Sequence, residues 1–293
     1  MGPAVATRSL ENLLDRHDPA PRLLLRVTLD PSVGAWPQRV RAVTGVRSFS
    51  KLVKDTFRRA GFELHRYIPR LSPDAQLALI LTHLDVDLVL DVGANEGQYV
   101  ETLRALGYRR RVVSFEPLAS AHAKLSATAA SDPGWEVAPR AALGDAEGEV
   151  PLNVSGHSLS SSILDMLPLH EQASLGSSVV GKELVPLARL DQMGFPYLKD
   201  ARSVLLKIDT QGYEERVLAG AAGILDRIRA IQCELSLAPL YRGQPLFDEM
   251  RERVDRLGFE LYAVFPGYVH DRTGQTLQVD GLFVRRGSGA GRS

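Results

Sequence analysis

The sequence of 293 residues contains a single cysteine, Cys233, and no long run of apolar residues. One cysteine excludes an internal disulfide and a cysteine-rich metal site, which fits a reducing compartment. No segment reaches the roughly 18 apolar residues that a transmembrane helix needs, so we expect no membrane span. Met1-Gly2 begins a myristoylation pattern, but Ala6 stands where that pattern needs serine or threonine. We therefore expect a cytoplasmic protein.

The formal net charge is also zero, because the sequence has 35 Lys and Arg residues and 35 Asp and Glu residues. This balance removes the electrostatic argument for a nucleic-acid or anionic-membrane partner. The short basic runs Arg58-Arg59 and Arg109-Arg110-Arg111 are typical of solvated helix ends and turns. The expected partner is a small molecule.

Apolar runs alternate with helical patterns from residue 88 onward. Strands are expected at residues 88–92, 112–116, 135–139, 204–209, 230–234, 259–265 and 281–285, and helices near 100–106, 118–130, 213–227 and 246–257. Such alternation predicts an α/β domain with a mostly parallel sheet. The last two strands would form a closing hairpin with an antiparallel edge strand.

The segments before and after this domain, and one serine-rich stretch within it, have their own sequence patterns. Prolines at positions 19, 21, 31 and 37 punctuate residues 1–46 and indicate an irregular arm, followed by helical patterns at 48–61 and from Ser72-Pro73 onward. We expect an arm with lead-in helices at 1–85, the main domain at 86–286 and a flexible tail at 287–293. A serine-rich stretch at 155–178 predicts a long loop over the carboxyl ends of the sheet, where such folds bind ligands.

The most informative stretch is Asp91 to Tyr99, DVGANEGQY, which stands between an expected strand and a helix. A dinucleotide fingerprint needs a first glycine where this chain has Asp91. Gly93 and Gly97 would allow close approach of a ligand, although an ordinary tight turn also needs such glycines. Because a carboxylate there repels a pyrophosphate, the ligand's near end is expected to be cationic or zwitterionic. S-adenosylmethionine fits, and Asp91 either contacts it or orients the turn.

Glu116 ends the second expected strand, 19 residues beyond Gly97. An acidic residue at this point is typical of a bidentate contact to ribose hydroxyls. The alternative is a residue that interacts with the start of the next helix.

Two further carboxylates end neighbouring expected strands. Asp209 in KIDTQGYE would orient an acceptor, act as a base or bind a metal, and the alternative is a cap of the following helix. Lys207 has the same side-chain parity and is expected to pair with Asp209. Glu234 ends the next strand, so one interpretation is that Asp209 and Glu234 converge on one cation or one substrate hydroxyl, and the alternative is that the two carboxylates are unrelated. Glu214 would neutralise the first turn of the helix after Asp209.

Taken together, these motifs resemble the FkbM family of S-adenosylmethionine-dependent methyltransferases. The matching segments are LDVGANEGQY at 90–99, SFEP at 114–117, AALGDAEGEV at 141–150, SSSI at 160–163, LKIDTQGYE at 206–214, CELS at 233–236 and DGLFVRR at 280–286. The resemblance covers residues 48–286 in order. It implies a Rossmann-like methyltransferase fold, here preceded by a helical arm, and methylation of a hydroxyl on a sugar, glycolipid or polyketide-type natural product.

The resemblance also implies roles for individual residues. Gly93, Ala94, Asn95 and Gly97 would line the methionine end of the cofactor, Glu116 its ribose, and Ala141-Ala142-Leu143 its adenine. The family's motif K-I-D-x-E-G has Gln211 in place of its second acidic residue. This departure weakens any role for position 211 and leaves Asp209 as the functional group.

We therefore hypothesise an O-methyltransferase in which Asp209 orients or deprotonates the acceptor and Glu234 assists, with a divalent cation such as Mg²⁺ as an optional participant. An amino-group enzyme would carry N/D-P-P-Y after the fourth strand, and a cytosine C5 enzyme would carry Pro-Cys, whereas Cys233 follows Gln232. The remaining alternatives are a non-catalytic nucleotide-binding module and a nicotinamide-dependent oxidoreductase.

Overall fold

The computed structural model describes residues 51, 54–59, 72–173 and 176–287. The chain divides into two compact units, Met1–His65 and Arg66–Ser293. Residues 51 and 54–59 are helical, within the helix expected at 48–61. The expected arm at 1–46 and tail residues 288–293 lie outside the described residues. Among the described helices, none has the length and apolar composition needed to cross a bilayer.

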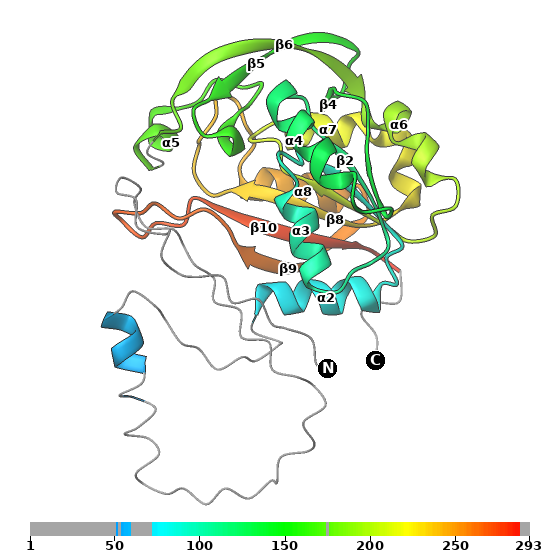
Figure 1. The fold of residues 1–293 in the computed structure, drawn as a ribbon, viewed down its shortest axis with the longest axis horizontal. Helices are drawn as coiled ribbons and strands as arrows, with labels where there is room; N and C mark the ends of the chain where they lie inside the picture. The colour runs from blue at the N-terminus through cyan, green and yellow to red at the C-terminus, as the bar shows by residue number, and fades with distance from the viewer. Residues whose placement is uncertain (1–50, 52–53, 60–71, 174–175, 288–293) are drawn as a thin grey trace, which may run out of the picture. The chain divides into compact units, whose positions relative to one another are not determined.

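The second unit is built on a seven-stranded sheet (Figure 1). Its strands are β1 (Leu88–Val92), β2 (Arg111–Phe115), β3 (Trp135–Val137), β7 (Val204–Ile208), β8 (Ile228–Ser236), β9 (Phe259–Pro266) and β10 (Gln278–Arg285). The strand order is β3-β2-β1-β7-β8-β10-β9, with parallel pairing from β3 through β8. The prediction of an α/β fold with a mostly parallel sheet is confirmed.

The closing hairpin differs from the expectation in one respect. Strand β10 pairs antiparallel with both β8 and β9, so the antiparallel strand lies inside the sheet and β9 forms the edge. The side chains explain this order. Leu282, Phe283 and Val284 of β10 are buried, whereas Leu261, Tyr262 and Val264 of β9 are exposed.

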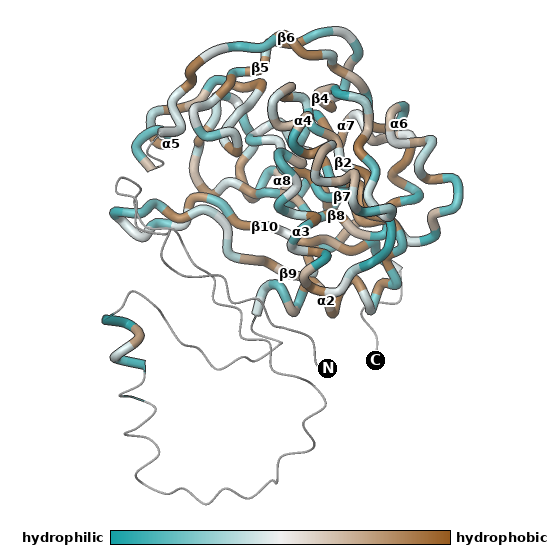
Figure 2. Tube along the Cα trace, viewed as in Figure 1, coloured by the Kyte–Doolittle hydropathy of each residue, from teal (hydrophilic) through white to brown (hydrophobic). Residues whose placement is uncertain are grey.

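Helices cover both faces of the sheet, because the strands are apolar on both sides. One face packs against α2 (Pro73–His83), α3 (Gln98–Ala105) and α4 (Ala119–Ala129). The other packs against α6 (Leu190–Met193), α7 (Glu214–Gly220), the 3₁₀ helix η5 (Ala222–Arg227) and α8 (Phe247–Arg256). Hydrophobic segments recur along the strands in the middle of the unit (Figure 2). Helix α2, which the sequence assigns to the lead-in, belongs to this unit, and the boundary at residue 85 stays a prediction.

A second sheet, which the sequence did not predict, follows β3. It contains β4 (Ala142–Gly144), β5 (Gly148–Ser155) and β6 (Val179–Arg189) in the order β4-β6-β5, and the β5–β6 pair forms the top of the unit in Figure 1. Gly181 and Pro186 interrupt the sequence of β6, and both residue types count against a strand. The expected loop is therefore shorter, and it contains η3 (Ser158–Ser160) and α5 (Pro168–Ala173).

Candidate active site

The turn after β1 is packed tightly against the end of β7. Gly93 has φ +77°, and a Cβ added there would lie 1.8 Å from the carbonyl oxygen of Asp209. The N–H groups of Gly93 and Ala94 both donate to the carbonyl of Phe115, at 3.1 Å. Glycine is therefore required at position 93 by the approach of two backbone segments, and this contact fixes the turn beside Asp209.

The second glycine of the turn has a different neighbour. Gly97 has φ +104° at the N-cap of α3, and a Cβ there would lie 2.4 Å from the ring of Trp135. The sequence favoured ligand approach as the reason for this glycine. In the structure its close neighbour is the indole ring, and its predicted contact with the cofactor stays a prediction.

Asp91 is completely buried near the end of β1, in a network that joins four strands. Its Oδ2 accepts a hydrogen bond from Ser114 Oγ at 3.0 Å, and Trp135 Nε1 donates to the same Ser114 Oγ at 3.0 Å. Lys207 Nζ lies 3.1 Å from Asp91 Oδ1 and donates to the Gly93 carbonyl, also at 3.1 Å. Asp91 thus orients the glycine turn through Lys207, which binds both Asp91 and the Gly93 carbonyl.

Lys207 pairs first with Asp91 rather than with the expected Asp209. Its Nζ lies 3.7 Å from Asp209 Oδ2, farther than from Asp91 Oδ1 at 3.1 Å. Burial acts to lower the pKa of Lys207, but Asp91 and Asp209 outweigh it and raise that pKa above its ordinary value. The ammonium is therefore charged, and the expected pairing with Asp209 is only the weaker of its two ion pairs.

Glu116 follows β2 and makes the predicted interaction near the start of the next helix, while its ribose contact stays a prediction. Its Oε2 accepts the Asn95 N–H at 2.8 Å, and its Oε1 accepts the Leu118 N–H at 2.8 Å near the start of α4. The side chain is buried beside the turn. Burial raises the pKa of Glu116 to about 7, although the two N–H groups act to lower it. The carboxylate is thus held in one orientation, with both oxygens retaining lone pairs for a ligand.

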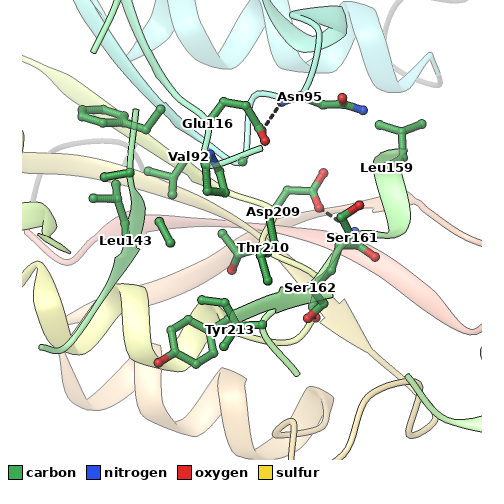
Figure 3. A pocket seen from close by; sticks show the side chains of 18 of the residues that line it. Val92, Asn95, Glu116, Leu143, Leu159, Ser161, Ser162, Asp209, Thr210 and Tyr213 are labelled. Atoms are coloured by element: carbon green, nitrogen blue, oxygen red, sulfur yellow. Dashed lines mark hydrogen bonds between the residues drawn. The ribbon is translucent and has the colours of Figure 1, made fainter. Parts of the chain in front are cut away.

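A cavity opens above these residues at the carboxyl ends of β1, β2 and β7, as expected for an open α/β sheet (Figure 3). It encloses about 640 Å³, part of it open to solvent. Its lining includes Gly93, Asn95, Glu116, Ala141, Ala142, Leu143, Leu159, Ser161, Ser162, Asp209, Thr210, Gln211 and Tyr213. Figure 3 shows Leu143 and Leu159 on opposite sides, with Asp209 between them. Among the described residues, Asp91, Ala94 and Gly97 are not part of this lining.

Asn95 presents an unused acceptor at this cavity. The residue is buried with φ +47°, and its Nδ2 donates to Ser158 Oγ at 3.2 Å. Its Oδ1 has no hydrogen-bond partner among the described residues. A buried amide oxygen without a donor is costly, so a ligand that donates a hydrogen bond fits here.

The carboxylates of Asp209 and Glu234 are brought together, as the sequence predicted, by a residue that sequence reasoning discounted. Gln211 Nε2 donates to Asp209 Oδ1 at 2.8 Å and to Glu234 Oε2 at 3.1 Å. Its Oε1 accepts from the Tyr241 hydroxyl at 2.8 Å. Because carboxylates only accept hydrogen bonds, the amide N–H₂ must face them. The signal that pointed to Gln211 was its place in the family motif.

Glu214, rather than Asp209, supports the start of α7. One oxygen of Glu214 accepts the N–H groups of Thr210 at 2.9 Å and Gly212 at 3.0 Å. The alternative interpretation of Asp209 as a helix cap is therefore wrong. The Asp209 side chain keeps 35% of its surface exposed, toward the cavities.

A second cavity lies next to the first. Its lining residues are His157, Leu159, Ser160, His170, Asp209, Gln211, Glu234, Tyr268 and Gln278. Leu159, Asp209 and Gln211 line both cavities, so these three residues form the boundary between them. The two cavities thus meet at the Asp209 carboxylate.

The predicted metal role of Asp209 and Glu234 finds no support in the side-chain geometry. Within residues 51, 54–59, 72–173 and 176–287, no group of three or more His, Cys, Asp or Glu side chains is arranged to hold a metal ion. The residue between the two carboxylates, Gln211, directs N–H groups rather than oxygen toward them.

A three-layer α/β unit with a cavity at the carboxyl ends of its first strands defines a Rossmann-like fold. The model of the methyltransferase FkbM domain family matches residues 91–261, more than half of the chain. The chain belongs to this family, and the predicted resemblance is confirmed. By family, this protein is a methyltransferase.

Similar solved structures include three methyltransferase-fold proteins of low sequence identity. An rRNA methylase from Streptococcus thermophilus is 13% identical over 73% of this chain and 96% of its own, with a TM-score of 0.39. The CcbJ methyltransferase from Streptomyces caelestis is 10% identical over 76% of this chain and 100% of its own, at 0.38. Aeropyrum pernix fibrillarin with bound S-adenosyl-L-methionine is 10% identical over 68% and 66%, at 0.38. No curated protein matches the chain.

Proposed function

We propose that this protein is an S-adenosylmethionine-dependent O-methyltransferase acting on a hydroxyl of a sugar, glycoside or polyketide-type natural product. The observation that carries the proposal is the meeting of two cavities at Asp209. One cavity has the family's cofactor motifs in its walls, and the other has room for an acceptor.

The first cavity is the proposed cofactor site. Glu116 would accept hydrogen bonds from the ribose hydroxyls, and the Asn95 amide oxygen would accept one from the methionine end. Ala141, Ala142 and Leu143 provide an apolar wall that fits an adenine ring. When bound, S-adenosylmethionine supplies a methyl group on a cationic sulfur that an oxygen nucleophile attacks in line.

Asp209 is the proposed catalytic residue, because its carboxylate lies between the two cavities. It would hold the acceptor hydroxyl in line with the cofactor and accept its proton. Orientation of this kind supplies roughly 7–11 kcal/mol, and a base adds about 10²–10⁴-fold. Glu234, joined to Asp209 through Gln211, would assist.

Two titrations test the cofactor assignment. Calorimetry with S-adenosylhomocysteine and with NAD is expected to show tight binding of the first and none of the second. Preference for NAD would support the oxidoreductase, and binding without turnover of any hydroxyl acceptor would support the non-catalytic module.

Asp209→Asn tests the catalytic assignment. We expect methyl transfer to fall by about 10²–10⁴-fold while S-adenosylhomocysteine still binds, because the amide keeps the shape of the side chain but cannot take a proton. The assay is run with and without EDTA, which also tests the predicted divalent cation. Undiminished activity of Asp209→Asn in EDTA would rule out both the base and the metal role.

A further inference from the structure

The second cavity is rich in hydrogen-bond acceptors and has no lysine or arginine among its described lining residues. Its two carboxylates, Asp209 and Glu234, each give one oxygen to the amide of Gln211. Gln211 thereby uses both of its N–H hydrogens. Of the remaining carboxylate oxygens, Asp209 Oδ2 lies 3.7 Å from Lys207 Nζ, so a bound molecule would add donors chiefly at Glu234.

His170 adds a third acceptor to this cavity. Its ring is 3% exposed, and it packs against the rings of Tyr241 and Tyr268 at centroid distances of 5.1 and 5.8 Å. Nε2 lies 3.2 Å from Ser160 Oγ, whereas Nδ1 has no hydrogen-bond partner among the described residues. With the proton on Nε2, Nδ1 is a buried acceptor that has no protein donor among the described residues.

His170 brings no positive charge to the cavity. Burial lowers the pKa of its imidazole to about 4, so the ring is neutral near pH 7. His157, the other histidine of the lining, is exposed at the cavity's rim. The inner wall therefore consists of two carboxylates and neutral polar groups.

The charged groups around the carboxylate of Glu234 are mostly negative. Burial, followed by the charges of Asp209, Glu214 and Asp280, raises its pKa well above the ordinary value, and the cation that opposes this is Lys207. Lys207, however, is shared with two other carboxylates, at 3.1 Å from Asp91 and 3.7 Å from Asp209. A cation delivered into the second cavity would stabilise Glu234 in its charged form.

We propose that the acceptor carries a protonated amino group, which binds in the second cavity to the carboxylates of Glu234 and Asp209 and to Nδ1 of His170. This inference rests on the proposed function and narrows it to amino sugars or other amino alcohols. An ammonium has three N–H donors for these three acceptors. It fits better than a metal ion, because Gln211 turns N–H groups toward both carboxylates. An anionic acceptor would meet two carboxylates whose neighbouring cation, Lys207, is already paired with Asp91 and Asp209.

The test compares three probes of one size on the full chain saturated with S-adenosylhomocysteine. The probes are glucosamine, glucose and glucuronic acid, which are cationic, neutral and anionic, and binding is followed by ligand-observed NMR. We expect glucosamine to bind at least about tenfold more tightly than glucose, and glucuronic acid to bind more weakly than both, since a hydrogen bond to a charged group contributes about 1.5–3 kcal/mol.

Glu234→Gln is the decisive variant, because it removes the charge and keeps the size of the side chain. It is expected to weaken glucosamine binding by about 10- to 100-fold and to leave glucose binding unchanged. Glu171→Gln, on the exposed surface of α5, is the matched control and is expected to bind all three probes like the original protein. Binding of S-adenosylhomocysteine reports that each variant is folded.

Three results would overturn the inference. They are no preference for glucosamine over glucose, a preference that persists in Glu234→Gln, and displacement of glucosamine by an equal concentration of Mg²⁺. Absence of glucosamine binding counts as no preference. Failure of the original protein to bind S-adenosylhomocysteine would instead contradict the proposed function, so the two failures are distinguishable.

Discussion

At the scale of single residues, the site depends on a glycine, which has no side chain, as much as on the polar side chains around it. The backbone of Gly93 approaches the Asp209 carbonyl so closely that a Cβ would lie 1.8 Å from its oxygen. The same residue has φ +77°, where an L-residue is strained. One glycine therefore couples the turn after β1 to the end of β7, where Asp209 lies.

Gly93→Ala tests this coupling. We expect a loss of about 3 kcal/mol or more in unfolding free energy, because the left-handed backbone costs about 1–2 kcal/mol and the steric overlap about 1–3 kcal/mol. Gly107→Ala is the matched control, with φ +91° but nothing within 4 Å of the added Cβ. It is expected to cost about 1–2 kcal/mol in the same urea titration. Equal losses in the two variants would contradict the steric argument.

At the scale of elements, a polar network joins three neighbouring parallel strands. Ser114 of β2 accepts from Trp135 of β3 and donates to Asp91 of β1. All three side chains are buried, so every polar atom removed leaves a partner unsatisfied. The network gives the carboxyl edge of the sheet a fixed geometry under the first cavity.

Ser114→Ala is expected to lower the unfolding free energy by about 2–4 kcal/mol, because it leaves the Trp135 N–H and an oxygen of Asp91 without their bonds. Ser131→Ala is the control, since its exposed hydroxyl donates to Thr128 and should contribute less than about 0.5 kcal/mol. Thermal and urea unfolding measure both. A loss in Ser114→Ala no larger than in the control would show that the network does not stabilise the sheet.

At the scale of the whole molecule, the formal charges sum to zero, but acidic side chains are concentrated at the carboxyl edge of the sheet. Burial raises the pKa of Glu116 and of Asp280 to about 7, and that of Glu214 to about 6. These groups bind protons more tightly in the folded than in the unfolded chain. Their stabilising contribution is therefore present at low pH and is lost as the pH rises through their folded values.

The unfolding free energy is accordingly expected to fall by roughly 1–2 kcal/mol between pH 6.5 and 8, from Glu116 and Asp280 together. His170, with a pKa lowered to about 4 by burial, acts in the opposite direction, but mainly below its unfolded value of 6.5. Urea titrations across this range measure the slope. Glu116→Gln should reduce the fall by about half, and a stability that rises with pH in both proteins would contradict the argument.

Several site residues were predictable because they depend on local order. A strand, a glycine turn and a helix follow one another in the chain, so the positions of Asp91, Gly93, Glu116, Asp209 and Glu234 at strand ends follow from hydropathy and spacing. Parallel strands align those ends on one edge, which predicts that Asp209 and Glu234 lie close together. Family membership followed from the same motifs and is confirmed.

Other features were decided by contacts between distant segments. Lys207 lies closer to Asp91 than to Asp209, and Gly97 faces Trp135, because side-chain partners depend on how distant segments pack in three dimensions. The β4-β6-β5 sheet escaped prediction because Gly181 and Pro186 weaken the strand pattern, while pairing with β5 and β4 compensates. Position 211 was discounted for its departure from the family's acidic residue, yet its amide joins the two carboxylates.

By itself the sequence determined the alternation of strands and helices, the glycine turn and the family, because each of these depends on residues that are close together in the chain. Only the tertiary structure decided that two cavities meet at Asp209 and that His170 lines the second with an unused nitrogen. The reason is that a cavity is the space left between segments far apart in the chain. Its shape and charge exist only after all of them have packed.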